Sequence, residues 1–99
     1  MAVDADTRAL MRRLAEAVRV RRDELGETQQ VVAERGGIDY RVLQLVESGR
    51  RNITLATLLR VARGLDLAPS ELLARVEAMP DPGDLVRQPG RPPRPAASS

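Results

Sequence analysis

Apolar residues recur along the first 79 residues at the three- and four-residue spacing of amphipathic helices. The first segment runs from about Asp6 to Leu25, and Gly26 can end it in a left-handed conformation. Its apolar residues share one side of a helix: Leu10, Leu14, Val18 and Leu25, with Met11 and Ala17 beside them. The pattern predicts a long first helix that packs along this side.

Four shorter segments follow, and each begins with a residue that favours the start of a helix. The second segment stops at Gly36-Gly37, and the third runs to about Ser48 before Gly49 closes it. The starting residues, in chain order, are Thr28, Asp39, Thr54 and Pro69. Since no segment alternates like a strand, we predict an all-α fold of five helices.

The expected core consists of the apolar residues that share the inner side of each short helix. They are Val32 and Ala33 in the second helix, Ile38, Val42, Leu43 and Val46 at the third, Leu55, Leu58, Leu59 and Ala62 in the fourth, and Leu72, Leu73 and Val76 in the fifth. For Val76, together with Met79, a dimer contact is the alternative role.

Residues 80–99 hold six of the seven prolines and few apolar side chains. Proline at this density prevents regular backbone hydrogen bonding, so we predict a disordered proline- and arginine-rich tail. Residues 1–79 are then the one domain for which a chain of 99 residues has room. The tail arginines are expected to be solvated, with contact to DNA or a partner as the alternative: Arg87, Arg91 and Arg94.

Composition narrows the classes of function. The chain has no cysteine and no histidine, which excludes disulfides, thiolate metal sites and the commonest general base. Its acidic residues, such as Glu16 and Glu24 or Asp81 and Asp84, are spaced like solvated charges. We therefore expect no enzymatic activity, no metal and no cofactor. No apolar run reaches the roughly 20 residues that span a bilayer, and the acidic start differs from a secretory signal, so we expect a bacterial cytoplasmic, nucleoid-associated protein with no membrane contact.

The basic residues are unusual because all 16 are arginine, although the net charge is only +2. The planar guanidinium suits phosphates and guanine edges. A GC-rich genome would also favour arginine over lysine, and this explains most of the bias. Composition thus allows nucleic-acid binding without showing it.

The predicted third helix, about residues 39–48, has two unlike sides. On a helical wheel the side away from the core carries the only aromatic ring of the chain, a guanidinium, a carboxamide and a leucine. These residues are Tyr40, Arg41, Gln44 and Leu45, followed by Ser48. Tyrosine and arginine are common contact residues, which favours a binding surface. A solvated side with two isolated apolar groups is the alternative.

The stretch "TQQVVAERGGIDYRVLQLVESGRRNITLATLLRVARGLDLAPSELL" joins two short helices by a glycine-containing turn and continues into two more. It resembles the Cro/C1-type helix-turn-helix regulators, the phage-repressor-like XRE family, over about residues 10 to 76. The matching positions include Thr28-Gln29, Ala33, Gly37, the apolar Ile38, Leu43 and Val46, and the exit Glu47-Ser48-Gly49-Arg50-Arg51-Asn52. Ala33 is expected where two helix axes cross, and Gly37 where the turn needs a positive φ.

The resemblance implies a lambda-repressor-like domain whose third helix reads the major groove of double-stranded DNA. Arg41 suits guanine and Gln44 suits adenine, with Tyr40 beside them, while Leu45 could contact a thymine methyl or a protein. The alternative is that Tyr40 packs along the second helix and Arg41 is solvated. The implied phosphate contacts are Gln29, Arg50, Arg51 and Asn52. For Arg50 and Arg51 the alternative is an ordinary charged loop.

The resemblance also implies an ion pair between Arg22 and Glu47, which would tie the first helix to the reading helix. The other arginines of the first helix are expected to be solvated: Arg12, Arg13, Arg19 and Arg21. Three residues depart from the family. Val31 removes a capping box, Glu27 replaces an apolar residue, and Asp66 stands where glycine is common.

These features predict a sequence-specific DNA-binding transcriptional regulator, a repressor because no activating domain is attached. One recognition helix reads only a few base pairs, so we expect a homodimer. Nothing in the sequence marks the dimer surface. The alternative is a protein-interaction module on the same fold, such as an antitoxin or a regulator that docks a toxin, sigma factor or polymerase, which Tyr40, Leu45 and the tail favour.

Overall fold

The computed structural model describes residues 5–82, so the predictions for the chain start and for the tail residues 83–99, including Arg87, Arg91 and Arg94, lie outside the described residues. Within residues 5–82 the structure has five helices and no strand, which confirms the all-α prediction. The helices are α1 (Ala5–Leu25), α2 (Gln29–Gly36), α3 (Tyr40–Ser48), α4 (Leu55–Gly64) and α5 (Pro69–Ala78). None of these helices is both long and apolar enough to cross a membrane.

The predicted caps hold the starts of the short helices. The Thr28 hydroxyl accepts a hydrogen bond from the Val31 amide at 3.2 Å, and Thr54 accepts one from Thr57 at 3.1 Å. Asp39 accepts one from the Arg41 amide at 2.7 Å. Each bond satisfies a backbone N–H group that has no partner inside its helix. The start of each of these helices is therefore fixed by a capping residue two or three positions before the bonded amide.

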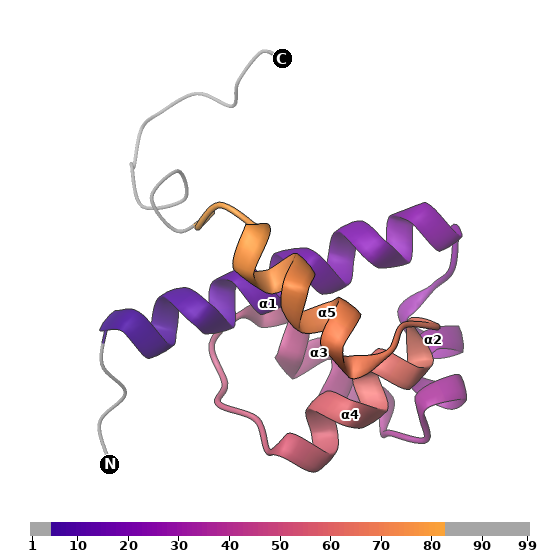
Figure 1. Ribbon diagram of the computed structural model, residues 1–99. Coiled ribbons are helices and arrows are strands. Elements are labelled where there is room, and N and C mark those ends of the chain that lie inside the picture. The colour runs from indigo at the N-terminus through magenta and orange to yellow at the C-terminus, as the bar shows by residue number, and fades with distance from the viewer. Residues whose placement is uncertain (1–4, 83–99) are drawn as a thin grey trace, which may run out of the picture.

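The five helices meet around one small core. Figure 1 shows α1 running the length of the domain, with α5 crossing it and α2, α3 and α4 gathered to one side. The helix α1 packs against α3 and α5, and α2 packs against α3 and α4. The fully buried large side chains are spread along the domain from α1 to α5: Val18, Val32, Leu43, Val61, Leu65 and Leu72.

Several leucines predicted to be core are exposed instead, so this part of the core prediction is wrong. Leu55 is 69% exposed, and the others are Leu10, Leu59 and Leu73. The buried residues of α4 are Val61, Ala62 and Gly64, so Leu55 and Leu59 lie at the edge of its buried side. The inner side of α1 carries Met11, Ala15, Ala17 and Val18. Val76 is buried as expected, and Met79 is partly buried against the core; their alternative role in a dimer contact stays a prediction.

The helices α2 and α4 approach each other closely at a pair of glycines. A Cβ atom on Gly36 would collide with the carbonyl oxygen of Arg60, and one on Gly64 would collide with that of Val32. Ala33 is buried as expected, yet the crossing needs two residues that have no side chain at all. The sequence indicates Gly36 only as a helix end, because nothing in it shows which residue on α4 lies opposite.

Gly64→Ala is therefore expected to destabilise the domain by about 2 kcal/mol, as overpacked cores typically do. In an open helix the same change would stabilise by about 1 kcal/mol, so the sign separates the two cases. Urea unfolding followed by circular dichroism measures it. Gly37→Ala is the comparison, since Gly37 has open space around it and only its φ of 73° opposes the substitution. A stabilised Gly64→Ala variant would contradict the close contact.

Candidate nucleic-acid interface

The helices α2 and α3 are joined by a tight turn at Gly37–Asp39. Gly37 has φ 73°, its amide donates to the Glu34 carbonyl, and the Ile38 amide donates to the Ala33 carbonyl at 3.0 Å. These two hydrogen bonds end α2 at the left-handed Gly37, and they set the direction in which the chain continues into α3. The positive φ predicted for Gly37 is confirmed, and Asp66, which stands where glycine is common in the family, is left-handed with φ 58°.

The helix α3 is held against the domain along one side. Leu43, Val46 and Glu47 are buried there, Leu43 completely. The Arg22 guanidinium binds the Glu47 carboxylate through two bonds, Nε to Oε2 at 2.9 Å and Nη2 to Oε1 at 3.0 Å. These hydrogen bonds raise the pKa of Arg22 above its ordinary value, despite partial burial. The ion pair implied by the resemblance is thus present, and it fixes the C-terminal end of α3.

A second arginine of α1 reinforces this end. Arg19 donates to the Glu47 backbone carbonyl and to the Glu16 carboxylate. The sequence interpretation missed this role, although Arg19 lies three residues before Arg22 and so shares its side of the helix. The last turn of α3 is therefore attached to α1 through both the side chain and the backbone of Glu47.

The opposite side of α3 faces outward. Tyr40 is 43% exposed and Leu45 is 40% exposed, and Arg41, Gln44 and Ser48 are exposed as well. Within residues 5–82 the side chains of Tyr40, Arg41 and Gln44 make no hydrogen bond or ion pair. The domain does not cover these groups, so their polar atoms are free to meet another molecule.

One shallow hollow, of about 470 Å³, lies beside the start of α3. It is lined by Arg22, Thr28, Gln29, Gln30 and Tyr40. Tyr40 thus stands next to α2, as the alternative interpretation expects, while keeping much of its ring exposed. The first amides of α2 also open here, because only the Val31 amide is taken by the Thr28 cap.

A second hollow, of about 180 Å³, lies on the other side of α3. It brings Leu45 and Val42 together with Arg51 and Asn52 of the following loop. The loop is tied to the helix end, since the Arg50 amide donates to the Ser48 hydroxyl at 3.2 Å. Arg50 itself is exposed and lines neither hollow. The two hollows therefore flank the outward side of α3, each with residues predicted to contact phosphate.

The prediction that the other α1 arginines are solvated is wrong, because all four are partly buried. Arg12 binds the Asp81 carboxylate through two bonds of 2.9 and 2.8 Å, and Arg21 donates to the Leu65 carbonyl at 2.9 Å. The Nε atom of Arg13 is buried. The bonded partners lie 44 and 69 residues away in the sequence, beyond the reach of any local pattern.

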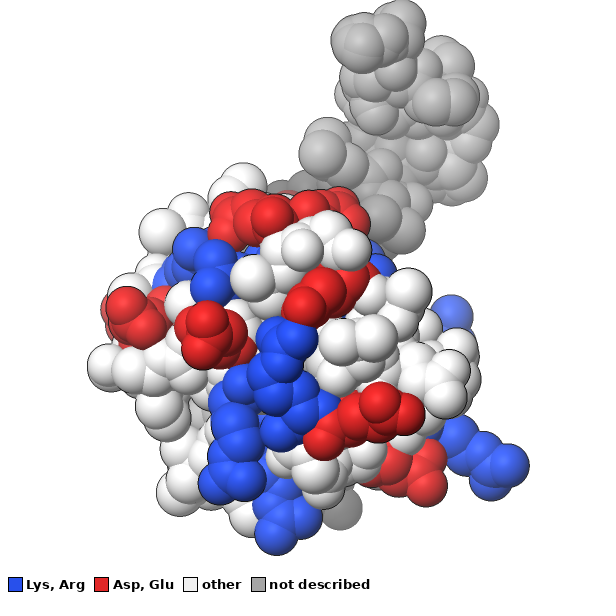
Figure 2. Space-filling view, turned by 90° about the vertical axis from the view of Figure 1, so that its right-hand side faces the viewer, with Lys and Arg blue, Asp and Glu red and all other residues white. Residues whose placement is uncertain are grey.

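Several acidic residues, Glu24 among those expected to be solvated, also have partners. Glu24 accepts hydrogen bonds from Arg75 and Arg21, which lower the pKa of its carboxyl. Glu27 accepts one from Arg35 at 2.5 Å, and this bond lowers the pKa of the Glu27 carboxyl. Figure 2 shows that positive and negative side chains are interleaved on the face viewed there. Many arginines of the domain therefore have partners within the fold.

The helices α2 and α3 are joined by a short turn that contains glycine, and α3 is buried on one side and exposed on the other. This arrangement defines a helix-turn-helix protein. A helix-turn-helix family model matches residues 11–72, and the chain belongs to this family, of the Cro/C1 type. It is thus a DNA-binding transcription regulator.

Solved structures of two restriction-modification controller proteins are similar to the chain. That of C.AhdI from Aeromonas hydrophila is 32% identical with a TM-score of 0.58, and the match covers 63% of this chain and 94% of that one. Wild-type C.Esp1396I is 22% identical with a TM-score of 0.64, over 70% of this chain and 90% of that one. A search of curated proteins gave no match.

Proposed function

We propose that the chain binds specific double-stranded DNA sequences as a homodimer, with α3 in the major groove, and represses transcription. The observation that carries this proposal is the outward side of α3. Tyr40, Arg41 and Gln44 are exposed, and their side chains make no hydrogen bond or ion pair within residues 5–82, while the other side of the helix is buried and its end is fixed. Because α3 is held in this way, its exposed side chains have a fixed orientation relative to the rest of the domain.

The side chains on this surface match the donors and acceptors of base edges. The Arg41 guanidinium suits the two acceptors of guanine, and the Gln44 carboxamide suits the donor and acceptor of adenine. Leu45 supplies an apolar contact for a thymine methyl group. Tyr40 stands at the start of the helix, between this surface and the hollow beside α2.

Phosphate contacts are proposed on both sides of the reading helix. Gln29 and the free amides of α2 lie in one hollow, and Arg51 with Asn52 lies in the other. Helix starts attract anions, because unpaired N–H groups and the helix dipole point outward there. Arg50 adds a third positive or polar group in the same loop. These contacts position the domain without reading its sequence.

Selection from random DNA with the purified protein tests the proposal. We expect enrichment of a two-fold symmetric motif, with half-sites one helical turn, about 34 Å, apart. A reporter gene placed behind the enriched motif then measures the sign of regulation, and we expect lower expression. Failure to enrich any motif, or affinity equal for all sequences, would overturn specific reading.

Arg51→Ala is expected to weaken DNA binding on every sequence alike. The slope of log affinity against log salt should shrink by about 0.9 for each phosphate that is no longer neutralised, so by about 1.8 for a dimer. Fluorescence anisotropy across a salt series measures the slope. Arg60→Ala removes the same charge from the exposed surface of α4 and is the matched control, expected to leave the slope nearly unchanged. Equal effects of the two substitutions would count against the phosphate contact.

A second candidate is a protein-interaction module, with a toxin, sigma factor or polymerase as the partner. It is favoured by Leu45, which is 40% exposed and lies beside Val42 and Ile53 at the hollow after α3. Here we expect a stoichiometric partner in pull-downs with the wild-type chain and none with Leu45→Arg. Absence of any partner at all salt concentrations would exclude this candidate.

A further inference from the structure

The last turn of α3 needs partners for its carbonyl groups, because the last four carbonyls of an α-helix have none within the helix. The Leu45 carbonyl accepts a hydrogen bond from the Ser48 hydroxyl at 2.6 Å, a partner inside α3 itself. The Glu47 carbonyl accepts its bond from Arg19, which belongs to α1. Arg19 therefore completes, from another helix, a cap that α3 forms only in part.

One side of α1 contacts the exit of α3 at several points. Gly49, the first residue after α3, packs so closely on α1 that a Cβ atom there would lie 3.4 Å from the Cβ atom of Ala15. The residues of α1 that meet this exit are spaced three and four apart: Arg12, Ala15, Arg19 and Arg22. Because this spacing places side chains on one side of a helix, α1 supports the exit of α3 along a continuous line.

The loop that follows, residues 50–53, has few hydrogen bonds of its own. The Arg50 amide donates to the Ser48 hydroxyl at 3.2 Å, but the amides of the next three residues have no hydrogen-bond partner within residues 5–82. The far end of the loop is held where Thr54 caps α4. A segment with so few internal bonds takes its position from its two ends.

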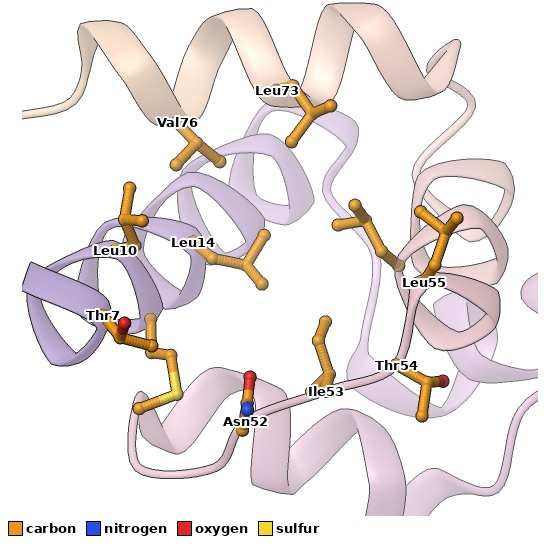
Figure 3. A pocket seen from close by; sticks show the side chains of 11 residues that line it. Thr7, Leu10, Leu14, Asn52, Ile53, Thr54, Leu55, Leu73 and Val76 are labelled. Atoms are coloured by element: carbon orange, nitrogen blue, oxygen red, sulfur yellow. The ribbon is translucent and has the colours of Figure 1, made fainter. Parts of the chain in front are cut away.

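Packing contributes at the far end of the loop. In Figure 3 Ile53 points from the loop into an apolar groove of about 240 Å³, which Leu14 of α1 lines as well. Ile53 is only partly buried there, and Asn52 beside it is exposed. Open space beside an apolar side chain leaves it with fewer contacts, so the start of the loop depends on how the end of α3 is held.

We propose that Arg19 is a positioning residue for DNA binding, which holds the exit of α3 so that the loop presents Arg51 and Asn52 to phosphate. Arg19 does this through its bond to the Glu47 carbonyl, without touching DNA. Its second bond, to the Glu16 carboxylate at 2.6 Å, orients the guanidinium. The cation also lies at the C-terminal end of α3, where the helix dipole favours positive charge. This inference rests on the proposed phosphate contacts of the loop.

Amide hydrogen exchange of the full chain, measured without DNA, tests the structural half of the proposal. The Gly49 amide is buried and donates to the Val46 carbonyl at 3.1 Å. In Arg19→Met this amide should exchange roughly tenfold faster or more, the factor expected when a hydrogen bond to a charged group is lost. The amides of α4, such as that of Val61, should change much less. Equal acceleration in α4 would show that Arg19 only stabilises the whole domain, and would overturn the proposal.

Arg35→Met is the matched control. Arg35 donates to the Gly64 carbonyl at the end of α4 and to the Glu27 carboxylate, so it makes the same two kinds of bond at a different helix end. We expect this variant to leave both the exchange of the Gly49 amide and the affinity for DNA unchanged. If Arg35→Met accelerates the Gly49 amide as much as Arg19→Met does, the effect is not specific to Arg19 and the proposal is wrong.

A salt series with DNA tests the functional half. Arg19→Met should shrink the slope of log affinity against log salt, by at most the value of about 1.8 expected for Arg51→Ala in a dimer. In the Arg51→Ala background Arg19→Met should have no further effect on the slope, because the charge that it positions is already absent. A further reduction in the double variant would mean that Arg19 binds phosphate itself, which contradicts a positioning role.

The failure of this inference and that of the proposed function are distinguishable. If Arg51→Ala shrinks the slope and Arg19→Met does not, positioning by Arg19 is wrong while the phosphate contact of the loop stands. If Arg51→Ala leaves the slope unchanged, the proposed phosphate contact is wrong, and the role of Arg19 in DNA binding is overturned with it. Circular dichroism at the temperature of each titration verifies that every variant is folded.

Discussion

Replacing Glu47 by alanine is expected to lower the free energy of unfolding by about 3 kcal/mol. The substitution removes the carboxylate that binds two nitrogen atoms of Arg22 at 2.9 and 3.0 Å, and it leaves a guanidinium that is only 20% exposed without its partner. A partly buried charge without a partner keeps its desolvation cost and loses the compensating attraction. Urea unfolding at neutral pH measures the change.

Two variants test this explanation of the Glu47 effect. Arg22→Met combined with Glu47→Leu should recover most of the stability, because an apolar pair of similar size replaces a buried ion pair at little cost. Arg75→Ala breaks the exposed pair with Glu24 and should change stability by about 1 kcal/mol or less. If Glu47→Ala is no more damaging than Arg75→Ala, the ion pair does not hold α3 in place.

Replacing Gln44 by alanine is expected to reduce affinity for the preferred DNA sequence by about 2 to 6 kcal/mol in a dimer, at about 1 to 3 kcal/mol for each bidentate contact. Gln44 is exposed and its carboxamide has no partner within residues 5–82, so the substitution should leave the fold unchanged. Non-specific binding depends on phosphate contacts and should stay the same. Titration of specific and scrambled duplexes, at one stated salt concentration, measures the difference.

Gln30→Ala is the matched control for this prediction. It removes the same carboxamide from an exposed position at the start of α2, in the hollow where phosphate contacts are proposed and not on the base-reading side of α3. We expect a small effect, equal on the two duplexes. A Gln44→Ala variant that loses affinity for both duplexes equally would show that Gln44 contacts the backbone of the DNA and does not read a base.

The residues of the candidate site were predictable from the sequence, but the two hollows beside it were not. The wheel placed Tyr40, Arg41 and Gln44 on one side of a short helix, and all three are exposed there. This worked because helical geometry fixes the directions of neighbouring side chains. The two flanking hollows, which join Tyr40 to α2 and Leu45 to the loop after α3, depend on how three segments come together.

The sequence by itself determined where the helices start and stop. Thr28, Asp39 and Thr54 cap helices through amides two or three residues away, and Gly37 supplies the left-handed turn. These interactions act within a few residues, so they are present in the linear order of the chain. The all-α architecture and the division into five helices follow from them together with the apolar spacing.

Only the tertiary structure decided which side of each helix is buried and which charges are paired. Leu55 and Leu59 have the spacing of a buried side, but the Gly36–Gly64 contact sets the rotation of α4 and turns them outward. Arg12 meets Asp81 across 69 residues of sequence. Packing between helices that are far apart in the chain decides these points. A helix with apolar residues on more than one side can bury any of those sides, and only its neighbours determine which one.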